Sequence, residues 1–304
     1  MPNLGIKIGW LKLKNPVIAA SGTFGFGKEF KDFINLKKLG AITTKTITLK
    51  PRKGNLLPRT CETPCGLLNS IGLENPGIEV FIKEKMPFLK QIGIPIIISI
   101  ASADDPQEFV ILAKRLDKIK EIAAIELNIS CPNIRENPRL ISQDPKATYN
   151  LVKAVRKVTQ KIIITKLSPN VTDILEIAQA AKAAGTDALS LVNTFYGMGI
   201  DINTKRPKLG SIIGGLSGPA IKPIALSLVY KVAQNLKVPI IGMGGIMNTA
   251  DALEFILAGA TAISVGTANF INPKASIEII EGIKKYLIKN NIKDIKKLIG
   301  SIKL

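Results

Sequence analysis

Short runs of apolar residues recur along the chain, and longer segments with helical spacing separate them. Each run is almost continuously apolar, which is typical of parallel strands covered by helices on their outer side. Between the runs, apolar residues recur at helical intervals, as at Ala147, Leu151 and Val155. This alternation predicts an α/β fold, a single (β/α)8 TIM barrel over residues 1–304. The eight predicted strands occupy residues 17–22, 41–48, 95–102, 123–130, 161–168, 188–194, 239–245 and 262–268.

The segments outside this pattern predict where a site would lie. Residues 5–9 and 11–15 are expected to form a short N-terminal hairpin that caps the barrel bottom. Three long connections, residues 49–77, 131–144 and 195–217, follow the second, fourth and sixth strands and are rich in Gly, Pro and polar residues, as loops are. They should therefore project from the C-terminal face, where barrel enzymes keep their active sites. Residues 284–304 are expected to form an amphipathic helix with a basic face.

Composition narrows the class of protein. The chain has 304 residues, of which 46% are hydrophobic and 21% charged, and this favours a folded core over disorder. It shows no apolar run near the ~20 residues of a membrane span and no secretory signal, so a cytoplasmic protein without a membrane partner is expected. The net charge is +19, but lysines spread along the whole chain favour a compositional bias over a nucleic-acid-binding surface.

The absence of histidine excludes several kinds of chemistry. Ser-His-Asp and Cys-His catalysis and His-ligated zinc all require that residue. The three cysteines, Cys61, Cys65 and Cys131, are too few for a four-thiolate cluster and are interpreted as reduced thiols. Cys61 and Cys65, four residues apart, fit buried loop thiols better than a metal half-site, so no metal is predicted.

Glycines gather where the seventh and eighth strands end. Gly244 and Gly245 follow one strand, and Gly266 with Thr267 follows the other. Such glycines let backbone N–H groups approach a phosphate, and a helix from Thr249 adds its positive N-terminus. Residues 214–218 are expected to open the next long helix and to extend this cradle. A G-x-G-x-x-G motif is absent, so the sequence gives no indication of a Rossmann dinucleotide site.

Two lysines and one cysteine are candidates for chemistry. Lys45 and Lys166 lie near the ends of the second and fifth strands. A lysine that points into the barrel there implies an anionic ligand, whereas an ordinary solvated lysine is the alternative. Cys131 follows the fourth strand, and a thiol can act as a base when a cation or dipole lowers its pKa. Amides such as Asn128 and Asn193 could hold the polar edges of a heterocycle.

A common pattern covers five segments from the first strand onward. They are residues 19–27, Lys45-Thr46, residues 69–73 with 75–77, residues 128–133 and residues 214–220. Together they resemble class 1 dihydroorotate dehydrogenase. Ile71 and the continuation at residues 74–77 are more similar to subclass 1B, the catalytic subunit of the NAD-dependent enzyme, than to the fumarate-using subclass 1A. The membrane helices of class 2 are missing, and the class 2 base is Ser rather than Cys.

The resemblance implies an FMN-dependent enzyme that oxidises dihydroorotate to orotate in de novo pyrimidine synthesis. Cys131 would remove the C5 proton while a hydride passes from C6 to the flavin, and residues 132–144 would form a lid. Ser99 stands where the family pattern has Asn. FMN would be held by Ser21, Lys45, Thr46, Ser99, Asn128, Lys166, Val192, Gly218, Gly244, Gly245, Gly266 and Thr267. Dihydroorotate would be bound by Lys45, Asn69, Ser70, Ile71, Gly72, Leu73, Asn128, Asn193 and Thr194.

The resemblance also implies a partner, because reduced FMN must be reoxidised. An iron–sulfur subunit with FAD and a [2Fe–2S] centre would pass electrons to NAD, in a heterotetramer built on a homodimer. The alternatives are a class 1A enzyme, a dihydropyrimidine dehydrogenase fragment and a tRNA dihydrouridine synthase, which normally has an extra RNA-binding domain. A non-catalytic barrel that binds a phosphorylated ligand, with Cys131 structural, is the remaining alternative.

Overall fold

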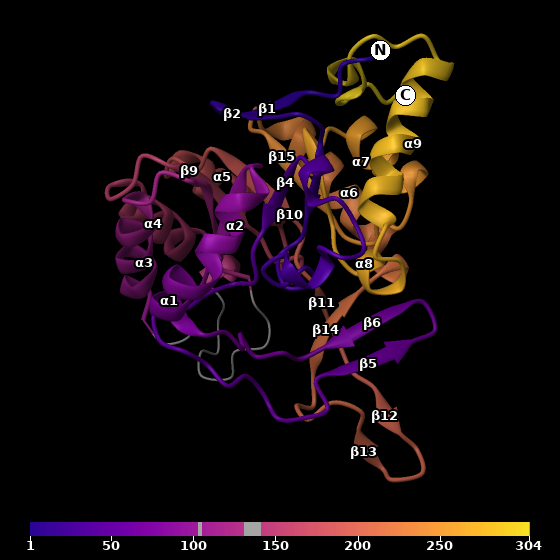
Figure 1. Cartoon of the computed structure of the whole chain (residues 1–304). Helices are drawn as coiled ribbons and strands as arrows, with labels where there is room; N and C mark the ends of the chain where they lie inside the picture. The colour runs from indigo at the N-terminus through magenta and orange to yellow at the C-terminus, as the bar shows by residue number, and fades with distance from the viewer. Residues whose placement is uncertain (103–104, 131–140, 304) are drawn as a thin grey trace.

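Eight parallel strands close a barrel at the centre of the molecule (Figure 1). The computed structural model describes residues 1–102, 105–130 and 141–303. Each predicted apolar run overlaps one barrel strand, which confirms the (β/α)8 fold, although all eight strands end earlier than predicted. Around the barrel the order is β10 (Ala188–Leu191), β15 (Ile240–Met243), β16 (Ala262–Val265), β3 (Val17–Ala19), β4 (Ala41–Thr43), β7 (Ile96–Ile100), β8 (Ile122–Asn128) and β9 (Ile162–Lys166).

Helices alternate with these strands and cover the outside of the barrel (Figure 1). Several begin at the side chains expected of helix starts: the Asp144 carboxylate accepts the backbone N–H of Lys146 and Ala147 ahead of α4. The α-helices are α1 (Gly77–Val80), α2 (Met86–Ile92), α3 (Gln107–Asp117), α4 (Pro145–Arg156), α5 (Ile174–Ala183), α6 (Lys222–Asn235), α7 (Thr249–Leu257), α8 (Ala268–Ile271) and α9 (Ala275–Lys289). The short 3-10 and π turns are η1 (Lys28–Phe30), η2 (Leu36–Lys38), η3 (Phe81–Lys85), η4 (Ile141–Gln143), η5 (Pro219–Ile221) and η6 (Ile295–Leu298).

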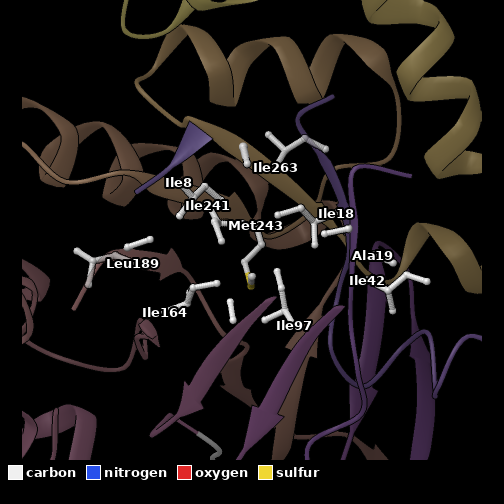
Figure 2. Packing of buried hydrophobic residues seen from close by; sticks show 14 of the residues in the cluster. Ile8, Ile18, Ala19, Ile42, Ile97, Ile164, Leu189, Ile241, Met243 and Ile263 are labelled. Atoms are coloured by element: carbon white, nitrogen blue, oxygen red, sulfur yellow. The ribbon is translucent and has the colours of Figure 1, made fainter. Parts of the chain in front are cut away.

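The N-terminal hairpin closes one end of the barrel. Strands β1 (Ile6–Ile8) and β2 (Leu11–Leu13) pair antiparallel, as predicted. A Cβ on Gly9 in their turn would lie 2.8 Å from the side chain of Ile162, the first residue of β9, so the turn lies against the start of that strand. Ile8 is fully buried in the same cluster as Ile164 and Ile241 of the barrel strands (Figure 2). This apolar end leaves the opposite end of the barrel for a site.

Two of the long connections form strands, and the expectation of loops was wrong there. β5 (Thr60–Thr63) and β6 (Gly66–Asn69) join β11 (Phe195–Gly197) and β14 (Gly214–Ser217) in one antiparallel sheet, in the order β11-β14-β6-β5. A smaller ribbon pairs β12 (Ile200–Asp201) with β13 (Arg206–Pro207). Figure 1 shows both at the end of the molecule away from the termini. Residues 131–140 of the third connection lie outside the described residues.

Two predicted helices also differ from the structure. Residues 214–217 form β14 rather than a helix start, because their backbone pairs with β6, and α6 begins only at Lys222. The expected helix over residues 284–304 ends at Lys289, since Asn291 adopts a left-handed conformation with φ of 56°. No helix in the described part of the chain is long and apolar enough to cross a membrane.

Candidate active site

A cavity opens at the carboxyl ends of the barrel strands, between the barrel and the four-stranded sheet. It brings together nearly all of the residues that the sequence predicted for a site. Of that set, Ser70 and Ser99 do not line it, and Cys131 lies outside the described residues. The predicted residues on its wall are Ser21, Lys45, Thr46, Asn69, Ile71, Gly72, Leu73, Asn128, Lys166, Val192, Asn193, Thr194, Gly218, Gly244, Gly245, Gly266 and Thr267.

Ser99 lies behind the cavity wall and supports it. Its side chain is fully buried, and its hydroxyl lies 2.9 Å from the hydroxyl of Thr46. Thr46 in turn accepts a hydrogen bond from the Asn128 amide at 3.0 Å and lies 3.2 Å from the Ser21 hydroxyl. Ser99 therefore fixes the orientation of a wall residue without lining the wall itself.

Ser70 also lies beneath the wall. It is fully buried, accepts a hydrogen bond from the Asn55 amide at 2.8 Å and is hydrogen-bonded to Ser211. The neighbouring Asn69 amide donates to the carbonyl of Gly215 at 3.1 Å, which joins β6 to β14. The loop that begins at Asn69 is thus held by the sheet on one side and faces the cavity on the other.

The two predicted anion-binding lysines differ in their surroundings. Lys166 in β9 is 6% exposed, and its ammonium makes no hydrogen bond or ion pair with any residue that the structure describes. Lys45 is partly exposed, and its ammonium lies 3.4 Å from the carboxylate of Glu74, which is also 3.2 Å from the guanidinium of Arg59. The sequence did not predict Glu74 as a site residue, because an exposed Glu in a loop carries no distinguishing pattern.

Asn193 ties the end of the sixth strand to the end of the fourth. Its amide donates to the carbonyl oxygen of Ser130 at 3.1 Å and to the Ser130 hydroxyl at 3.0 Å. The Asn193 carbonyl accepts the backbone N–H of Thr194, whose own carbonyl accepts from Asn170. Ser130 is fully buried and directly precedes Cys131 in the chain.

The glycine cradle forms at the ends of β15 and β16. Gly244 and Gly245 have φ of 122° and 76°, in the region that favours glycine. A Cβ on Gly245 would lie 2.8 Å from the carbonyl oxygen of Gly218, so these two segments approach closely. Ser264 lines the same region, and its buried hydroxyl has no hydrogen-bond partner among the described residues. An unpartnered hydroxyl beside a backbone cradle fits a polar ligand.

A cation and a helix start lie next to the cradle. α7 begins with a capping box in which the Asn248 side chain and Asp251 satisfy each other's backbone N–H groups. The Lys222 ammonium lies 2.6 Å from the Asp251 carboxylate and 3.0 Å from that of Glu254. The hydrogen bond that the Lys222 ammonium donates to Asp251 raises the pKa of Lys222, so this side chain stays charged beside Gly245.

Other wall residues were missed by the sequence analysis. Ser217 lies within the glycine-rich segment 214–218 and could have been found there, whereas Thr60 and Leu67 reach the wall only through the unforeseen sheet. The remaining missed residues are Ala20, Gly22, Thr23, Glu74, Ile221, Met243, Ile246, Met247, Ser264 and Phe270.

A closed (β/α)8 barrel with a polar cavity at the carboxyl ends of its strands, where barrel enzymes keep their active sites, defines the class of TIM-barrel enzymes. The chain belongs to the dihydroorotate dehydrogenase family, whose family model matches residues 3–287.

Curated relatives match along the whole chain. Three of them are named dihydroorotate dehydrogenase B (NAD(+)), catalytic subunit. The protein of Trichlorobacter lovleyi is 54% identical over 301 residues, which cover 99% of each chain. That of Thermoanaerobacter pseudethanolicus is 52% identical over 302 residues, again 99% of each chain. That of Caldicellulosiruptor bescii is 53% identical over 302 residues, 99% of this chain and 100% of the relative.

Proposed function

We propose that this chain is the catalytic subunit of an NAD-dependent dihydroorotate dehydrogenase, which oxidises dihydroorotate to orotate in de novo pyrimidine synthesis. The observation that carries the proposal is the single cavity in which Lys45, Lys166, the amides of Asn128 and Asn193, and the glycine cradle meet. The names and full-length identity of its relatives support the same activity. Since the reaction is a step of nucleotide synthesis that delivers electrons to NAD, we place the protein in the cytoplasm.

FMN is the cofactor that this cavity fits. Its phosphate would be held by the backbone at Gly244, Gly245 and Gly266, where the unpartnered Ser264 hydroxyl adds a donor. Lys166, a buried lysine on the cavity wall, would face the ring, where its ammonium would stabilise the negative charge that the ring carries once it is reduced. When bound, FMN supplies the acceptor for the hydride that leaves C6 of dihydroorotate.

The substrate would lie between the ring and the loop of residues 69–73. Dihydroorotate carries a carboxylate and an imide, so it requires a cation and several amide or backbone hydrogen-bonding groups. Lys45 supplies the cation, while Asn69, Asn128 and Asn193 supply the amides. Ser99 and Ser70 would act indirectly, since they hold Thr46 and the loop rather than line the cavity.

We propose Cys131 as the base that removes the C5 proton. Its place in the chain supports this choice. Cys131 directly follows Ser130, and the carbonyl oxygen of Ser130 accepts a hydrogen bond from Asn193 on the cavity wall. A positioned base contributes roughly 10²–10⁴-fold to such a reaction. No histidine is available in this sequence for the same task.

A second subunit would receive the electrons. The relatives carry the words "catalytic subunit" and "NAD(+)" in their names. We propose a partner with FAD and a [2Fe–2S] centre, in a heterotetramer built on a homodimer of this chain. Without it, this chain should transfer electrons from dihydroorotate to an artificial dye but hardly at all to NAD or fumarate.

Anaerobic bleaching of the purified chain tests the proposal. The protein should carry FMN and lose its yellow colour when dihydroorotate is added. Cys131→Ala should keep the FMN but bleach at least a hundredfold more slowly. Cys65→Ala should bleach normally, because it removes a thiol from the turn between β5 and β6 that is exposed and not buried as predicted. A chain without FMN, or one that dihydroorotate does not bleach, would refute the function, and normal bleaching of Cys131→Ala would refute the base.

A further inference from the structure

Two oppositely charged side chains are buried inside the barrel: Lys166 on the cavity wall, whose role is proposed above, and Glu126 beneath it, which has no role so far. Among the described residues, Glu126 is 2% exposed and Lys166 6% exposed. The third buried ionisable side chain among the described residues is Asp251, which forms an ion pair with Lys222. Neither Glu126 nor Lys166 forms an ion pair within 4.0 Å with a described residue. Both need an explanation, because lone charges are rarely buried.

Strand register brings the two side chains close together. Lys166 on β9 is aligned with Asn128 on β8 and with Ser190 on β10. Glu126 lies two residues before Asn128 on the same strand, so it shares its face of the sheet, one layer lower. The Ser190 hydroxyl lies 3.4 Å from one carboxylate oxygen of Glu126. The carboxylate of Glu126 therefore reaches up to the layer that contains Lys166.

The second carboxylate oxygen of Glu126 is buried and has no hydrogen-bond partner among the described residues. An unsatisfied carboxylate inside a protein is costly, and so is an unpaired ammonium. Opposite charges in one interior offset each other's cost, and their attraction extends beyond contact distance because the interior screens weakly. The charges of Glu126 and Lys166 therefore cancel inside the barrel, and removal of either one leaves the other uncompensated.

We propose that Glu126 is the internal counter-charge of Lys166 and thereby sets the reduction potential of the flavin. This inference rests on the proposed function, in which Lys166 faces the FMN ring. The ring is neutral when oxidised and carries negative charge after it accepts a hydride, so a positive interior favours the reduced form. Glu126 offsets that positive charge and keeps the potential lower, which favours onward electron transfer to NAD. Glu126 is thus a positioning residue that acts through Lys166.

The reduction potential of the FMN-loaded full chain tests this inference. In Glu126→Gln, the preference for reduced over oxidised FMN should rise about tenfold, which is about 30 mV for a two-electron couple. Anaerobic equilibration with a reference dye measures the shift. Glu121→Gln removes the same charge from an exposed position just before β8 and should leave the potential unchanged. An unchanged or lower potential in Glu126→Gln would overturn the proposal.

A double-mutant cycle on the flavin-free chain gives a second, independent test. Glu126→Gln and Lys166→Met should each lower the urea midpoint of unfolding. The midpoint of the double variant should fall by less than the sum of the two single decreases. Strict additivity would overturn the proposal. If Glu126→Gln alone does not fold, the double variant should fold, and its failure to do so would count equally against the pair. This cycle needs no FMN, so it stands even if the proposed function fails.

Discussion

At the scale of single residues, the cavity holds its two lysines in different ways. Lys166 is buried without a contact partner among the described residues, whereas Lys45 shares a half-exposed carboxylate, Glu74, with Arg59. Both lysines were predicted from their places near strand ends. Ser99 shows the limit of that reasoning, because its position near a strand end was correct while its side chain faces Thr46 instead of the cavity. Sequence gives the position along a strand, but the packing of neighbours decides what a side chain reaches.

Glu74→Gln should strengthen the binding of orotate. The Glu74 carboxylate competes with the anionic ligand for the ammonium of Lys45, and its removal leaves that cation available. Because the pair is partly exposed, the gain is about 0.5–1 kcal/mol, or roughly two- to fivefold in Kd, and it should shrink as salt is added. Titration of orotate into the FMN-loaded chain, followed by flavin absorbance, measures it. Glu62→Gln, the same change on exposed β5, should have no effect, and equal or weaker binding by Glu74→Gln would contradict this role.

At the scale of elements, the barrel could be predicted and the added sheet could not. Barrel strands such as Ile96–Ile100 are buried along their whole length, which leaves a continuous apolar run in the sequence. Thr60–Thr63 is short and half exposed, and Gly214–Ser217 begins with two glycines, which disfavour strands. Its pairing with Gly66–Asn69, about 150 positions away, depends on tertiary contacts that no local pattern records. The cavity wall was therefore predicted where barrel strands build it and missed where the sheet does.

Gly266→Ala should weaken the binding of FMN while the fold persists. Gly266 follows β16, and a Cβ there would meet the side chains of Ala20 and Thr23 at 3.6 and 3.8 Å, which are ordinary contact distances. Since all three residues line the cavity, the methyl group would fill the space in which the phosphate approaches the backbone. We expect at least a tenfold rise in the FMN dissociation constant, measured by fluorescence quenching, with an unchanged circular dichroism spectrum.

Gly199→Ala is the matched control for that variant. Its methyl group would meet only flexible side chains of Lys208 and Leu68, and Gly199 does not line the cavity. It should bind FMN as the unchanged chain does. Normal FMN binding by Gly266→Ala would mean that the phosphate lies elsewhere.

At the scale of the whole molecule, the cavity draws on strand ends from opposite sides of the barrel. Ser21 follows β3, Asn128 ends β8, Lys166 ends β9, and Met243 and Ser264 belong to β15 and β16. These strands lie on opposite sides of the closed ring. A ligand held by all of them at once stabilises the closed barrel and not just one loop, because the unfolded chain cannot present that set of groups.

Removal of FMN should therefore lower the unfolding temperature of the whole chain in a single transition. At a hundredfold excess over its dissociation constant, FMN contributes about 2.7 kcal/mol, which is about 4 °C for a chain of this length. Scanning calorimetry of the flavin-free chain with and without added FMN measures the shift. Riboflavin, which lacks the phosphate, should give a much smaller rise, because the ring alone leaves the glycine cradle and Ser264 unused. An equal rise with riboflavin would contradict the phosphate cradle, and a second transition with FMN would contradict stabilisation of the barrel as a unit.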